Sequence, residues 1–132
     1  MSGPAQLLVI NVLPTELYHD CRIQGTINVP LEELASYAES LNKEQPIVVY
    51  CGSYFSSVTA KAWHLLHDMG FSNIWAYEGG INEWKFAGLP TEGACTSGFV
   101  LEPVGPLRGH DTGVRQISKQ ELFDLMKKHG LL

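Results

Sequence analysis

The sequence lacks the features that would direct the protein to a membrane or to nucleic acid. No apolar stretch approaches the about 20 residues of a membrane-spanning helix, and the amino terminus has no charged-then-apolar signal segment. Nine lysines and arginines stand against fourteen aspartates and glutamates, which leaves a net charge of -5 without any basic run. We therefore expect no membrane partner, no nucleic-acid partner and, by default, a cytoplasmic location.

Cysteine is also scarce. The three cysteines, Cys21, Cys51 and Cys95, are an odd number without close spacing. This argues against a disulfide scaffold and leaves at least one free thiol. The 45% of apolar residues and 17% of charged residues are those of an ordinary globular domain.

Strands and helices alternate through the first ninety residues. Short apolar runs predict strands at residues 7–12, 26–29, 47–50 and 74–77. Helical spacing of apolar residues predicts helices at 31–41 and 57–69, with a helical turn at 15–19 and a short helix around Trp84. Such alternation predicts an α/β domain in three layers, a central parallel sheet with helices on both faces.

The composition changes after residue 90. Glycine and proline are frequent in residues 91–116, which predicts a loop-like or extended connection. Ser118 and Glu121 then have the spacing of a capping box, and a helix with one apolar face follows. We divide the chain into a core at 1–92, a glycine- and proline-rich connection at 93–116 and a C-terminal helix within 117–132.

A cysteine directly follows the buried strand at 47–50. Ligands of open α/β sheets bind at the carboxyl ends of the strands, where Cys51 stands. The N–H groups of the next loop and the start of the next helix favour a thiolate, which is the nucleophilic form. The alternative is a half-buried structural cysteine. Cys51 is the candidate nucleophile, and the candidate anion-binding loop consists of Gly52, Ser53, Tyr54, Phe55, Ser56 and Ser57.

Five segments within residues 8–90, about two-thirds of the chain, form a specific series. They are Asn-Val-Leu at 11–13, Cys-Arg-Ile-Gln-Gly-Thr-Ile-Asn-Val-Pro at 21–30, Ile-Val-Val-Tyr-Cys at 47–51, Gly-Phe at 70–71, and Glu-Gly-Gly-Ile-Asn-Glu-Trp at 78–84 with Ala-Gly-Leu-Pro at 87–90. In this order they resemble the rhodanese family, which usually has Asp-Val-Arg at the first segment. The resemblance implies a rhodanese-like α/β domain and a sulfurtransferase, in which Cys51 takes sulfur as a persulfide and passes it to a nucleophile. It implies no metal and no organic cofactor.

The loop after the cysteine departs from the family. Many active relatives have glycine third after the cysteine, where this chain has Tyr54, and then arginine, lysine or asparagine, which are absent here. In the family's loop conformation Tyr54 would cost roughly 1 to 2 kcal/mol of backbone strain. Because the loop has no cation, we expect thiosulfate to be a poor donor. The sequence names neither the donor nor the acceptor of sulfur.

Other functions are weighed against sulfur transfer. A catalytically weak or inactive binding module with this fold is the main alternative, and half of a tandem array with a structural role is another. A tyrosine phosphatase would need arginine six residues after the cysteine. That position is Ser57, which we expect to cap the next helix through its hydroxyl.

Further histidines and cysteines are given structural interpretations. His64 and His67, one turn apart, are assigned to a solvated helix face in preference to a metal pair. Cys21 and Cys95 are interpreted as inert small residues, with a persulfide relay as the alternative.

The C-terminal segment resembles an opening that the family usually has and this chain lacks. Relatives begin with an edge strand and a helix of pattern Ile-Ser-x-x-Glu-Leu, which occurs here at 117–122. A circular permutation would place 114–117 as an edge strand and 118–129 as the packed helix, within the chain or exchanged in a dimer. The alternative is a tandem protein cut where a second domain begins.

Overall fold

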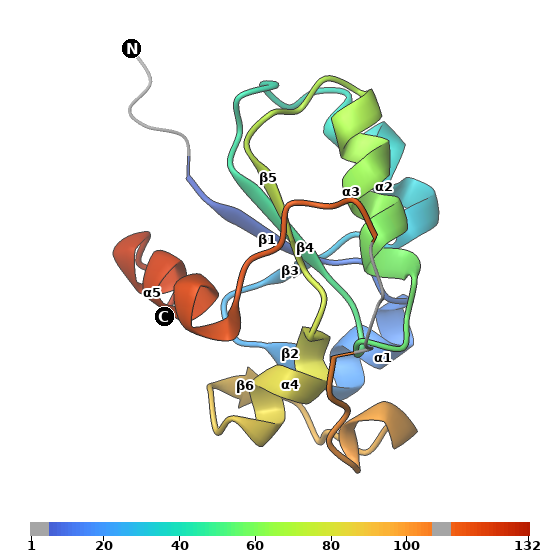
Figure 1. The fold of residues 1–132 in the computed structure, drawn as a ribbon, viewed down its shortest axis with the longest axis vertical. Coiled ribbons are helices and arrows are strands. Elements are labelled where there is room, and N and C mark those ends of the chain that lie inside the picture. Colours follow the sequence, from blue (N-terminus) through green and yellow to red (C-terminus); the bar gives the residue numbers. More distant parts are fainter. Residues whose placement is uncertain (1–5, 107–111) are drawn as a thin grey trace.

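The computed structural model describes residues 6–106 and 112–132, so residues 1–5 of the predicted core and 107–111 of the predicted connection lie outside the described residues. A parallel four-stranded sheet has the order β3-β1-β4-β5 (Figure 1). Helical crossovers keep the strands parallel. The strands are β1 (Leu8–Asn11), β3 (Ile27–Asn28), β4 (Ile47–Tyr50) and β5 (Ile74–Tyr77).

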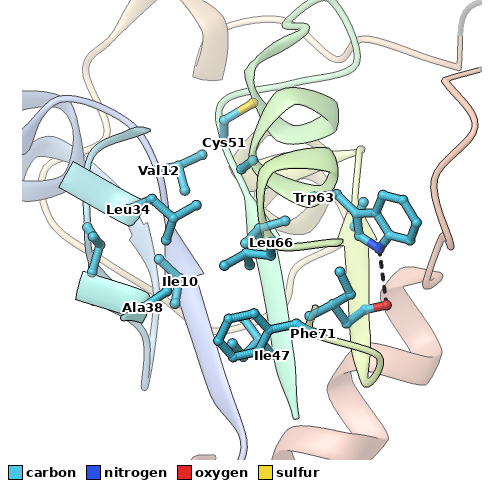
Figure 2. Close-up of a cluster of buried hydrophobic side chains, with 14 of the residues drawn as sticks. Ile10, Val12, Leu34, Ala38, Ile47, Cys51, Trp63, Leu66 and Phe71 are labelled. Atoms are coloured by element: carbon cyan, nitrogen blue, oxygen red, sulfur yellow. Dashed lines mark hydrogen bonds between the residues drawn. The ribbon is translucent and has the colours of Figure 1, made fainter. Parts of the chain in front are cut away.

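Helices α2 (Leu31–Ala38) and α3 (Val58–Asp68) cover one face of this sheet (Figures 1 and 2). Successive strand side chains point to opposite faces, so alternate residues of each strand meet these helices. The resulting buried cluster includes Ile10, Ile47, Val49, Ile74 and Ala76 from the strands and Leu34, Ala38, Ala62, Trp63 and Leu66 from the helices.

Helices α4 (Gly80–Phe86) and α5 (Lys119–Lys128) cover the opposite face. This arrangement confirms the predicted α/β domain with helices on both faces of a parallel sheet. None of the helices in the described ranges has the length and apolar composition to cross a bilayer. The second buried cluster includes Val9, Val48, Tyr50 and Tyr77 from the strands and Ile81, Trp84, Leu122 and Met126 from the helices.

The C-terminal segment packs against the sheet of its own chain. Gln116 forms a parallel bridge with Ala76, and the Ala76 N–H donates to the carbonyl of Arg115 at 2.8 Å. Helix α5 begins at the predicted capping box, in which Ser118 and Glu121 exchange side-chain and backbone hydrogen bonds. Leu122 and Met126 of this helix belong to the second buried cluster, so the helix packs on the sheet of its own chain.

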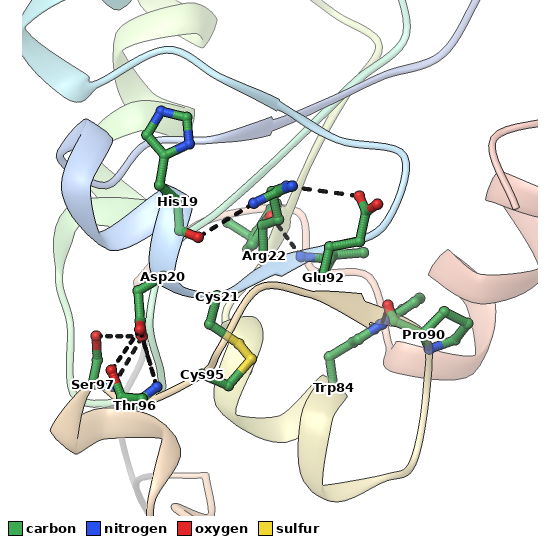
Figure 3. Close-up of a disulfide and its surroundings, with 12 residues drawn as sticks. His19, Asp20, Cys21, Arg22, Trp84, Pro90, Glu92, Cys95, Thr96 and Ser97 are labelled. Carbon is green, nitrogen blue, oxygen red and sulfur yellow. Dashed lines mark hydrogen bonds and ion pairs between the residues drawn. A yellow bond between two sulfur atoms is a disulfide. The ribbon is translucent and has the colours of Figure 1, made fainter.

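The interpretation of Cys21 and Cys95 as inert residues is wrong, because they form a disulfide across 74 residues of sequence (Figure 3). Their separation in sequence gave no sign that the fold brings them together. The same region contains a small antiparallel sheet, which the sequence did not predict, of β2 (Arg22–Ile23) and β6 (Thr91–Glu92). Disulfides are rare in cytosolic proteins, so this bond disagrees with the expected cytoplasmic location.

Asp20, the last residue of α1 (Thr15–Asp20), joins the same two segments of chain as the disulfide. Its carboxylate accepts bonds from the backbone N–H and the hydroxyl of both Thr96 and Ser97 (Figure 3). The hydroxyls of Thr96 and Ser97 contribute most to holding the pKa of Asp20 well below its usual range. The next residues form a short 3-10 helix, η1 (Gly98–Val100), whose Val100 is buried in the second cluster.

Removing the disulfide should destabilise the domain. With Cys21→Ser and Cys95→Ser together, we expect the free energy of unfolding in urea to fall by about 2 to 4 kcal/mol, because the unfolded chain loses a long cross-link. A reductant should cause the same loss in the unaltered protein. Cys51→Ser is the control, since it keeps the disulfide and should respond to reductant in the same way. Equal midpoints with and without the cross-link would contradict a stabilising role.

Removing the C-terminal segment should also destabilise the domain. Deletion of residues 114–132 exposes the apolar surface beneath Leu122 and Met126, so we expect a lower melting temperature or aggregation. Leu122→Ala alone should cost about 2 to 5 kcal/mol in urea denaturation, and the exposed Lys128→Ala is its control. A truncated protein that melts like the full chain would show that the tail contributes nothing.

Candidate active site

Strand β4 positions Cys51 at the carboxyl edge of the sheet. All four residues of the strand are buried, and Cys51 follows Tyr50 with 0% of its surface exposed. It belongs to the cluster beneath α2 and α3, and its sulfur is turned toward α3 (Figure 2). Cys51 is the free cysteine of the chain, as required of a nucleophile.

The amino terminus of α4 holds the beginning of the Cys51 loop. The Ile81 N–H donates to the carbonyl of Cys51 at 3.0 Å, and the Asn82 N–H donates to the carbonyl of Gly52 at 2.9 Å. Gly80 permits this approach, because its φ is +65° and a Cβ there would lie 2.5 Å from the Cys51 oxygen. The motif at 78–84 is therefore part of the site.

The rest of the loop forms a turn of its own. The Ser56 N–H donates to the carbonyl of Ser53 at 3.1 Å, and the Phe55 N–H donates to the Ser53 hydroxyl at 3.3 Å. Two N–H groups of the predicted anion-binding loop thus bond inside the loop in this conformation. Gly52 and Ser53 are buried, Tyr54 and Ser56 are half-buried, and Phe55 and Ser57 are exposed, Phe55 by 72%.

The hydrogen bond to the sulfur comes from Thr59, which the sequence analysis missed. Its hydroxyl donates to Cys51 Sγ at 2.7 Å, and Thr59 itself is 1% exposed. A signal existed in the spacing, because Thr59 lies on the helix face of the apolar residues Ala62, Trp63 and Leu66. A hydroxyl on this buried face can donate a hydrogen bond to the cysteine sulfur.

Two predictions about the loop are wrong. Tyr54 does not have a positive φ, so the expected backbone strain is absent. Among the described non-glycine residues, the one with positive φ is Cys95. The loop reaches α3 without needing glycine at position 54. Ser57 occupies the N-cap position of α3 but makes no capping bond. The hydroxyl of Ser56 accepts from the Val58 N–H at 3.2 Å instead, and Ser57 is exposed.

The two histidines of α3 make separate contacts. His64 Nε2 lies 2.7 Å from the carbonyl oxygen of Thr112, and the His67 ring stacks on Trp63 at 4.9 Å between centroids. Within residues 6–106 and 112–132, no group of three histidine, cysteine or acidic side chains could hold a metal ion.

Comparison with known proteins identifies the family. The model of the rhodanese-like domain matches residues 1–87. The chain belongs to the rhodanese-like family. Thiosulfate sulfurtransferase GlpE of Coxiella burnetii is 31% identical over 88 residues, which are 67% of this chain and 79% of that enzyme. The HTH-type transcriptional regulator Rv0324 of Mycobacterium tuberculosis is 33% identical over 66% of this chain, which spans only 38% of the regulator's length.

Solved structures of rhodanese-like domains share the fold. The domain of the Anabaena protein Alr3790, determined in solution by NMR, has a TM-score of 0.62 at 31% identity, over 83% of this chain and 80% of that one. A rhodanese from E. coli, solved with anions, has a TM-score of 0.53 at 27% identity, over 66% and 98% of the two chains. The rhodanese-like fold predicted from the motifs is therefore confirmed.

Removing the Thr59 hydroxyl should make Cys51 less reactive. Hydrogen bonds to charged groups contribute roughly 1.5 to 3 kcal/mol, so Thr59→Val should slow alkylation of Cys51 by iodoacetamide at neutral pH by roughly tenfold or more. Valine keeps the shape of threonine, and Thr59→Ser, which keeps the hydroxyl, is the control. If valine and threonine support the same rate, the hydroxyl does not stabilise the reacting sulfur.

Proposed function

We propose that this rhodanese-like protein is a sulfurtransferase that carries sulfur as a persulfide on Cys51. The observation that supports it is a free cysteine at the carboxyl end of β4, whose sulfur accepts the Thr59 hydroxyl at 2.7 Å. Relatives named thiosulfate sulfurtransferase support the same class of reaction.

The proposed reaction has two displacements at sulfur. The Cys51 thiolate attacks the outer sulfur of the donor, and the bond between that sulfur and the rest of the donor breaks. The leaving group departs with the electron pair, as sulfite does from thiosulfate, and Cys51 becomes a persulfide. An acceptor nucleophile then attacks the outer sulfur and restores the thiolate. The Thr59 hydroxyl would stabilise the negative sulfur before and after each cycle.

The binding-module alternative has one observation in its favour. Cys51 has no exposed surface, while Phe55 at the tip of its loop is 72% exposed. A domain used only for binding would present Phe55 and never open the loop. Sulfur transfer requires the loop to move, because a donor must reach Cys51 Sγ.

Mass spectrometry separates the two functions. After incubation with a persulfide donor, we expect intact Cys51 protein to gain the mass of one sulfur, because the free thiolate is the nucleophile. The gain should be absent in Cys51→Ser, and cyanide should remove it from the unaltered protein. Thiosulfate should load the protein more slowly, because the loop supplies no cation for an anion. Persistent absence of the added sulfur with every donor would favour the binding module, and its location elsewhere would overturn the assignment of Cys51.

A further inference from the structure

The carboxylate of Glu83 connects the Cys51 loop to the sheet. Glu83 Oε2 accepts a hydrogen bond from the Tyr54 hydroxyl at 2.8 Å, and Oε1 accepts one from the Tyr77 hydroxyl at 2.8 Å. Tyr77 ends strand β5 and is 1% exposed, so it is a fixed anchor. Gly79 leaves room for the carboxylate, since a Cβ at that position would lie 2.5 Å from Oε1. The middle of the loop is thus held to the sheet through one side chain.

Both phenols of this cluster act as hydrogen-bond donors. Burial raises the pKa of Tyr54, and the hydrogen bond to Glu83 raises it further. Burial also raises the pKa of Tyr77, with the charge of Glu83 as the next cause. Two neutral O–H groups that each face one carboxylate oxygen match an ionised carboxylate, and hydrogen bonds to a charged acceptor are the stronger kind.

The cluster holds the loop that begins at the thiol. Tyr54 is three residues after Cys51, between the buried Ser53 and the exposed Phe55. While Tyr54 is bonded to Glu83, Cys51 has 0% of its surface exposed. A donor can therefore reach the sulfur only after the surrounding structure moves, and the bond between Tyr54 and Glu83 opposes movement of the middle of the loop.

A second carboxylate lies near the middle of the loop. Besides Glu83, the carboxylate of Glu78 is close enough to contribute to the raised pKa of Tyr54. In the described part of the chain, Glu78 accepts hydrogen bonds from the neutral groups of Thr112 and Gln116. Lys119 borders the same surface hollow as Glu83, but no ion pair within 4.0 Å joins them in the described part of the chain.

We propose that Tyr54 and Glu83 determine the donor specificity of Cys51: their hydrogen bond keeps the loop closed, and the Glu83 charge disfavours anionic donors such as thiosulfate relative to uncharged ones. This inference rests on the proposed function of Cys51. Tyr54 and Glu83 act through access and charge, so they are positioning residues.

Two alkylating agents of similar size and different charge test the proposal. Iodoacetamide is neutral and iodoacetate is an anion, and each forms a carbon–sulfur bond with the thiolate as iodide leaves. Cys51 is the free cysteine, so the rates report on this site. The ratio of the two rates is divided by the ratio for N-acetylcysteinamide, a small uncharged thiol, to remove the intrinsic difference between the reagents.

Tyr54→Phe tests the closure of the loop. Without the hydroxyl, both reagents should react about tenfold faster, since a charge-assisted hydrogen bond no longer opposes opening. The ratio should stay unchanged, because Glu83 remains. Tyr37→Phe, at an exposed position of α2, is the matched control and should change neither rate. Tyr77→Phe removes the other hydroxyl from the same carboxylate and should leave the loop closed.

Glu83→Gln tests the charge. It should raise the rate with iodoacetate by about fivefold more than the rate with iodoacetamide, because one negative charge beside the cysteine loop is removed. Glu33→Gln, an equal charge change on α2, should leave the ratio as it was. The unaltered protein should lose its discrimination at high salt, and this measurement stands even if Glu83→Gln does not fold.

The outcomes separate the parts of the inference. Closure is overturned if Tyr54→Phe reacts no faster than the unaltered protein. The charge effect is overturned if neither Glu83→Gln nor salt changes the ratio. Alkylation does not depend on sulfur transfer, so a protein that behaves as expected here but never gains a persulfide overturns the proposed function alone.

Discussion

The candidate site depends on the hydrogen bonds that the start of α4 donates to the carbonyls of Cys51 and Gly52, because these bonds fix the beginning of the cysteine loop. They require Gly80, because any side chain there would collide with the Cys51 carbonyl. The side chain of Asn82 extends the connection, since it donates to the carbonyl of Glu102 at 2.7 Å and accepts from the Val104 N–H at 2.9 Å. One short helix therefore holds the cysteine loop on one side and the segment after the disulfide on the other.

The same helix explains how the loop accommodates a tyrosine. Glu83 is one turn beyond Gly79 on α4, and its carboxylate receives the hydroxyl of Tyr54. The loop needs neither a left-handed residue nor a cation to be ordered in this conformation. The N–H groups of α4, a turn within the loop and the bond between Tyr54 and Glu83 order it instead, and the carboxylate has a charge opposite to that expected for capturing an anion.

Much of the fold could be predicted because the signals are local. Strands β4 and β5 match the apolar runs at 47–50 and 74–77 residue for residue, and the capping box marks the start of α5. Periodicity and capping depend on neighbours a few residues apart, which a sequence displays directly. The place of Cys51 at the sheet edge followed from the same reasoning, because a residue after a buried parallel strand emerges at its carboxyl end.

By itself, then, the sequence determined the layers, the family and the cysteine, while the tertiary structure decided what surrounds that cysteine. The disulfide of Cys21 and Cys95, the Thr59 hydroxyl and the Glu83 carboxylate all depend on side chains that meet only after the sheet and helices have packed. Tyr54 and Glu83 are separated by 29 residues, and no periodicity links them. Their contact arises because the carboxyl end of β4 and the amino end of α4 lie at the same edge of the sheet. The linear order of residues does not show this proximity.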